Sequence, residues 1–177
     1  MKKFNLVAIA AMSIVLLSFN TAKAQKENKH FSAGFGLESG ATSGGASSVY
    51  KSTLGLTIRF SYHTGPGFLT FTSGGVVWLP KSGLGKSTKA SLQIPVKAGY
   101  KYIFHKPFFV MGELGYSSFK IYYNNNGGVA SNAAGGFTYA PTVGVNFNTF
   151  EAGIKYEATA VSGGNFSNIG LRLGFNF

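Results

Sequence analysis

Two short motifs in this chain contain residues that could carry out chemistry, but neither has its full pattern. The segment GLGKST at residues 83–88 is similar to the end of a phosphate-binding loop. That motif needs a glycine five residues before Gly85, where this chain has Pro80, and it should lead into a helix rather than a strand. The spacing His30-x-Ser32 suggests a base beside a nucleophile. The first segment is interpreted as a flexible outer loop, and the second belongs to the beginning of a predicted strand.

Metal and thiol chemistry have little support in the sequence. The three histidines, His30, His63 and His105, are scattered along the chain, which disfavours a metal site. The chain contains no cysteine, so disulfides, thiolate ligands and cysteine nucleophiles are excluded. We predict no enzyme activity, no catalytic residue, no cofactor and no metal site.

Nine charged residues have a more regular spacing. Each lies in a segment where apolar residues occupy every second position, at one of the positions between them. Each therefore belongs to the polar face of a predicted strand. Four of the five acids in the chain are in this set. We predict that the nine side chains form one charge network: Glu38, Arg59, Lys97, Lys101, Glu113, Glu151, Lys155, Glu157 and Arg172.

The last ten residues show most clearly the kind of strand that carries these charges. Large apolar residues occupy every second position of the segment NIGLRLGFNF, and small or polar residues lie between them. This strict period of two predicts a β-strand with one apolar and one polar face. Lipid on one side and a polar lumen on the other would suit such a strand.

Eight segments of this kind are predicted along the chain: 30–39, 51–62, 67–78, 89–104, 108–122, 135–147, 150–161 and 168–177. Between them we expect loops at 40–50, 79–88, 123–134 and 162–167, which alternate with tight turns. A bulge or bend is expected at Gly74-Gly75, and another bulge near Ser117-Ser118. Trp78 and several tyrosines (Tyr62, Tyr100, Tyr102, Tyr122 and Tyr123) are interpreted as residues of the girdle at the membrane interface.

Residues 1–24 have the pattern of a cleaved signal peptide, with a basic start, an uncharged apolar run and an Ala22-x-Ala24 cleavage site. Of 16 Lys and Arg residues, Lys2, Lys3 and Lys23 lie in this leader, which leaves 13 against five acids, a formal charge of +8. For an exported chain this basic balance favours anionic lipid head groups over nucleic acid as the partner. The expected domains are the signal peptide, 1–24, and a barrel, 25–177.

These patterns predict an all-β fold, an eight-stranded antiparallel up-and-down transmembrane β-barrel. Long and short connections that alternate are typical of bacterial outer-membrane barrels, with the short turns and both ends of the chain on the periplasmic side. A barrel of eight strands is just wide enough to be filled by its own side chains. The charge network is therefore expected to fill the lumen with ion pairs. A soluble sandwich is the alternative, although the chain offers no second apolar layer.

The chain resembles the small outer-membrane β-barrel proteins of the OmpA/OmpX-like, porin-like superfamily over nearly all of its mature length. The resemblance rests on the leader together with Gly34-x-Gly36, Gln93-Ile94-Pro95-Val96, Phe109-Val110-x-Gly112-Glu113-Leu114-Gly115-Tyr116 and Leu171-x-Leu173-x-Phe175-x-Phe177. It implies a location in the bacterial outer membrane. It also implies that Leu171, Leu173, Phe175 and Phe177 form the signal read by the barrel-insertion machinery.

Several functions fit such a barrel. We expect a structural role in envelope integrity and surface properties, for a monomer in contact with outer-membrane lipid and with lipopolysaccharide, whose phosphates Lys81 and Lys86 would contact. A narrow pore for small solutes and a surface adhesion barrel are alternatives. A soluble lipocalin-like carrier would need an apolar interior. Lipid A-modifying barrel enzymes use Ser and His at the outer leaflet, whereas the histidines here map to the periplasmic rim.

Overall fold

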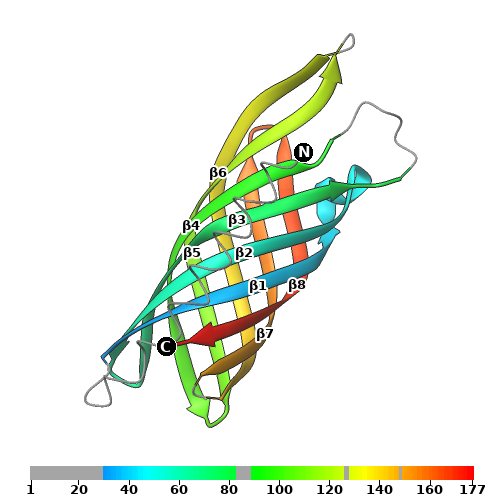
Figure 1. Ribbon diagram of the computed structural model, residues 1–177. Coiled ribbons are helices and arrows are strands. Elements are labelled where there is room, and N and C mark those ends of the chain that lie inside the picture. Colours follow the sequence, from blue (N-terminus) through cyan, green and yellow to red (C-terminus); the bar gives the residue numbers. More distant parts are fainter. Residues whose placement is uncertain (1–29, 83–88, 126–127, 148) are drawn as a thin grey trace, which may run out of the picture.

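The computed structural model describes residues 30–82, 89–125, 128–147 and 149–177 as one closed antiparallel barrel (Figure 1). The predicted signal peptide and the GLGKST segment lie outside the described residues. Each strand pairs with the next along the chain, and the last pairs with the first. The strands are β1 (Phe31–Ser43), β2 (Tyr50–Thr64), β3 (Gly67–Pro80), β4 (Ser91–His105), β5 (Phe108–Asn125), β6 (Gly128–Phe147), β7 (Phe150–Val161) and β8 (Gly164–Asn176).

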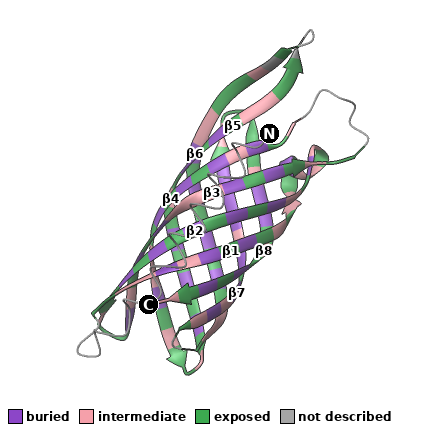
Figure 2. Ribbon diagram, viewed as in Figure 1, coloured by how far each residue is buried: buried purple, intermediate pink, exposed green. Residues whose placement is uncertain are grey.

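The two faces of the wall differ as the alternation predicts. Large apolar side chains on the outside remain exposed, among them Leu56, Leu114 and Leu171. Polar and charged side chains alternate with them and are buried inside, so buried and exposed residues form alternating bands across the strands (Figure 2). This polar interior is the reverse of what a lipocalin-like carrier needs. Within the described ranges, no helix is long and apolar enough to cross a membrane.

The barrel is closed by β1 and β8, which lie side by side over ten paired positions from Gly34–Asn176 to Ser43–Ser167. Two backbone hydrogen bonds extend this seam: the amide of Ala33 donates to the carbonyl of Phe177 at 3.1 Å, and the amide of Phe177 donates to the carbonyl of Ala33 at 2.9 Å. The predicted strand 168–177 is therefore the one that completes the ring of backbone hydrogen bonds, which a wall exposed to lipid requires.

Two predicted loops are wrong because paired backbone continues through them. Residues 123–134, rich in Asn, Gly and Ala, belong mostly to β5 and β6, which pair from Phe108–Val145 to Asn125–Gly128. This hairpin rises above the rest of the wall (Figure 1). Residues 164–167 belong to β8, and the turn before it contains Gly163 at φ +89°. Every residue except proline carries the backbone N–H and C=O that pairing needs, so the weak strand propensity of this segment was misleading.

The first loop also differs, since β1 continues to Ser43 and a 3₁₀ helix, η2 (Gly44–Ser48), leads to β2. Neither predicted bulge is present. Pairing passes Ser117 and Ser118 without a register shift, and at Gly74-Gly75 only the pairing to β4 is interrupted, opposite Pro95. Proline has no N–H to donate to the ladder, which explains the gap. Register shifts occur instead at Tyr50/Ser52 and Ile103/His105.

Candidate functional site

The nine charged residues predicted to share the lumen all lie buried inside the barrel and make nine ion pairs. Eight of them form a closed circuit in which acids and bases alternate. The circuit runs Glu157–Lys155–Glu38–Arg172–Glu151–Arg59–Glu113–Lys97 and returns to Glu157. We call this set the lumen ring. Lys101 is attached to it through Glu151.

Glu151 on β7 is the most highly connected acid of the lumen ring. Its Oε1 accepts hydrogen bonds from Arg59 Nη1 at 2.6 Å and from Arg172 Nη1 at 2.9 Å. Its Oε2 accepts a third from Lys101 Nζ at 2.9 Å. These donors come from β2, β8 and β4, so one carboxylate joins strands from different sides of the barrel. Charge-assisted hydrogen bonds of this kind offset the cost of removing the charges from water.

The lumen ring carries one base more than it has acids once Lys101 is included. Lys101 is only 4% exposed, and its ammonium lies 5.2 Å from the centre of the Phe68 ring and 5.4 Å from that of Phe109. An aromatic face attracts a cation, most strongly where water is excluded. The extra positive charge is thus shared between one carboxylate and two aromatic rings at the end of the lumen where the short turns lie.

Small residues make room for Arg172, one of the two arginines of the lumen ring. A Cβ atom at Gly36 would lie 2.5 Å from Arg172 Nη2, and one at Gly174 would lie 2.5 Å from Arg172 Nη1. The guanidinium therefore lies against two glycines on β1 and β8, beside the closing seam. Gly36 of the Gly34-x-Gly36 pattern consequently has a packing reason, which sequence reasoning did not find.

Neutral polar residues extend the network between the ion pairs. Thr72 Oγ1 donates to Glu113 Oε1 at 2.5 Å and accepts from Arg59 Nε at 3.0 Å. Gln93 Nε2 donates to Glu157 Oε1 at 2.7 Å, and Gln93 Oε1 accepts from Trp78 Nε1 at 2.8 Å. Gln93 thus connects the lumen ring to a second layer of side chains.

That second layer is aromatic and lies inside the barrel at the end opposite the short turns. Trp78 is 1% exposed and contacts Tyr50, Phe119 and Phe166 edge to face, with ring centres 5.2 to 5.9 Å apart. Assigning Trp78 to the membrane girdle was therefore wrong. Trp78 lies an even number of residues from the inward-facing Thr70 and Thr72, so the alternation of the strand places it on the same face. Its aromatic side chain led instead to the girdle interpretation. We call these four residues the aromatic layer.

The histidines and the residues of the proposed insertion signal lie outside the lumen ring. His30 and His63 come together at the rim of short turns, with ring centres 6.3 Å apart, while His105 ends β4. No group of three or more potential metal-binding side chains occurs among the residues the structure describes. Of the residues proposed as the insertion signal, Leu171, Leu173 and Phe175 point outward from β8 and Phe177 follows it.

The sequence profile of the family described as outer membrane protein beta-barrel domain matches residues 9–177 of the chain. No curated protein matches the chain closely enough to serve as a relative.

Several solved structures share the fold of the barrel. The attachment invasion locus protein Ail of Yersinia pestis has a TM-score of 0.59 at 16% identity, covering 83% of this chain and 96% of that chain. The N-terminal barrel of Pseudomonas aeruginosa OprF has a TM-score of 0.61 at 13% identity, covering 82% and 97%. Neisserial surface protein A has a TM-score of 0.59 at 12% identity, covering 84% and 97%. At these identities the likeness concerns the fold alone.

Proposed function

Because this chain belongs to the outer membrane protein β-barrel family and is located in the bacterial outer membrane, we propose that it is a sealed structural barrel. In this role it strengthens the envelope and shapes its surface without conducting solutes. The observation that carries the proposal is the lumen ring, a closed circuit of ion pairs whose members come from six of the eight strands.

The lumen ring supports a seal because it is cross-linked in several directions. A narrow barrel filled by its own side chains leaves no aqueous path. An ion that crossed would have to separate buried pairs such as Arg59–Glu151, at 2.6 Å, and separation in so dry an environment is costly. The aromatic layer forms a second barrier at the end opposite the short turns, with Phe119 and Phe166 centred 4.4 Å apart.

Conductance in planar bilayers tests the proposal. The wild-type protein should insert and give no discrete current steps. An opened variant provides the positive control: Trp78→Ala removes the centre of the aromatic layer, and Arg59→Ser with Glu151→Ser removes a pair without changing the net charge. This triple variant should produce steps under the same conditions. Discrete steps from wild-type protein as frequent as those from the triple variant would contradict the sealed barrel and favour a narrow pore.

The partners follow from the same proposal. The apolar outer wall contacts membrane lipid, and Lys81 with Lys86 contacts lipopolysaccharide phosphates, since clusters of basic residues beside the hydrocarbon attract anionic head groups. Leu171, Leu173, Phe175 and Phe177 are read by the insertion machinery during biogenesis. The barrel acts as a monomer.

Adhesion is the second candidate, and the β5–β6 hairpin favours it. Pairing of β6 with β7 begins at Phe137–Ala160, so residues 128–136 pair only with β5 over the part of the chain that the structure describes. A strand edge without a partner can accept a strand from another protein. A barrel of similar fold is named an attachment invasion locus protein, which is consistent with this function.

Cell-binding experiments would separate the two candidates. Replacing residues 121–132 with a two-residue turn joins the paired residues Lys120 and Ala133 and removes most of the part of β6 that pairs only with β5. Cells displaying this variant should bind host surfaces as well as cells displaying wild-type protein if the barrel is only structural. Loss of binding by the shortened barrel alone, at equal surface display, would establish adhesion.

A further inference from the structure

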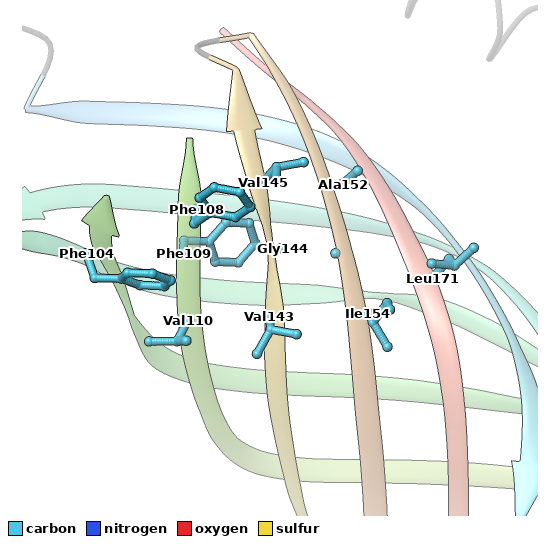
Figure 3. A pocket seen from close by; sticks show the side chains of 11 residues that line it. Phe104, Phe108, Phe109, Val110, Val143, Gly144, Val145, Ala152, Ile154 and Leu171 are labelled. Atoms are coloured by element: carbon cyan, nitrogen blue, oxygen red, sulfur yellow. The ribbon is translucent and has the colours of Figure 1, made fainter. Parts of the chain in front are cut away.

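We propose that the lipid-facing wall contains a binding site for one anionic phospholipid of the inner leaflet. The site is a hollow of about 400 Å³ on the outside of the barrel, within the range of about 300–1,000 Å³ typical of ligand pockets. Phe104 borders it on one side and Leu171 on the other, with the small side chain of Ala152 between them (Figure 3).

The hollow exists because one outward position carries a small side chain among large ones. On the part of β7 nearest the short turns the outward residues are Phe150, Ala152, Ile154 and Tyr156, and Ala152 pairs with Val145 and Leu173 on the adjacent strands. Its methyl group leaves a depression between bulkier neighbours. The lining is almost wholly hydrocarbon, and the hollow opens into the exposed apolar wall, so a lipid acyl chain is the occupant that suits it.

The position of the hollow along the barrel indicates which leaflet of the membrane it faces. Phe104 and Phe108 both line it, and they flank the tight turn between β4 and β5, where their rings stack with centres 6.4 Å apart. In outer-membrane barrels short turns face the periplasm. The hollow therefore lies at the level of the inner leaflet, which contains phospholipid.

The turn beside the hollow supplies the charge that a phospholipid head group requires. Lys106 and His105 lie in the segment between Phe104 and Phe108, and both are exposed. Each of the four acids among the described residues is buried in the lumen ring, so no described Asp or Glu side chain on the outer surface competes for Lys106. An ammonium within two residues of both Phe104 and Phe108 suits an acyl chain joined to a phosphate. A second copy of the chain would present another apolar wall without described Asp or Glu side chains and would leave Lys106 without an acidic partner.

Native mass spectrometry of the detergent-extracted barrel tests the site. The probe is an equimolar mixture of dipalmitoyl phosphatidylglycerol, which is anionic, and dipalmitoyl phosphatidylcholine, which is neutral overall. Ala152→Leu fills the hollow, with Ala98→Leu as its control, since Ala98 is an exposed outward alanine on β4 outside the hollow. Lys106→Gln removes the head-group charge, with Lys120→Gln as its control, an exposed lysine toward the other end of β5.

Wild-type barrel should retain one phosphatidylglycerol in preference to phosphatidylcholine. Ala152→Leu should reduce the adduct at least fivefold, and Lys106→Gln should lower phosphatidylglycerol to the level of phosphatidylcholine, while both controls match wild type. Equal adducts in Ala152→Leu and wild type would overturn the site, as would equal losses in Ala98→Leu. A preference for phosphatidylglycerol that survives Lys106→Gln would overturn the head-group assignment. Dimers that disappear in Ala152→Leu would assign the hollow to self-association instead.

Discussion

Replacing Glu151 with glutamine should destabilise the barrel more than any other single change of one acid in the lumen ring. The substitution keeps the shape of the side chain and removes the charge to which three cations donate hydrogen bonds. Arg59 and Arg172 keep other acids, Glu113 at 3.5 Å and Glu38 at 3.6 Å. Lys101 loses the one ion pair that it makes with a described residue.

The expected size follows from the energetics of buried pairs. Removing one partner of such a pair costs about 3–5 kcal/mol, because the remaining charge stays buried without compensation. We expect about 4 kcal/mol for Glu151→Gln, a large share of a typical total stability of about 5–15 kcal/mol. Glu113→Ala should cost less, because its ion pairs are longer, at 3.5 and 3.8 Å.

A double variant distinguishes charge imbalance from simple loss of packing. Lys101→Met combined with Glu151→Gln restores the original excess of one positive charge, so it should recover about 0.5–3 kcal/mol, the usual range of coupling between contacting residues. The free energy of unfolding would be measured by urea titration in lipid vesicles, with Trp78 fluorescence as the signal. If Glu151→Gln unfolds within about 0.5 kcal/mol of wild type, the lumen ring does not hold the barrel together.

Further predictions concern the aromatic layer and the packing of the wall. Trp78 is the single tryptophan of the chain, so its fluorescence should resist quenching both by acrylamide and by brominated lipid chains, whereas a girdle position would be quenched by the latter. Gly136→Ala should destabilise the wall by about 1–3 kcal/mol, because its Cβ would lie only 1.6 Å from the carbonyl oxygen of Ala160. Gly75→Ala is the control and should be neutral in urea titrations, since its nearest neighbour is a side-chain carbon at 3.7 Å.

The strand pattern could be predicted from the sequence because it is a local property of the backbone. Successive side chains of a strand point to opposite faces, so a run such as that around Arg172 determines which side chains share a face. Phe119 shows where residue type misleads: an apolar side chain at an inward position suggested a bulge near Ser117-Ser118. The alternation of inward and outward side chains continues through Ser117 and Ser118, and Phe119 packs inside the barrel against Trp78.

Only the tertiary structure decided which charges meet. The sequence alone placed all nine charged side chains on the inner face, because their parity requires it. The pairing depends on the tilt and stagger of the closed barrel, which bring Arg59 of β2 to Glu151 of β7 across 92 residues of chain. The closed circuit of the lumen ring, the place of Trp78 and the hollow at Ala152 all arise from this geometry. A single strand contains no information on what faces it across the lumen.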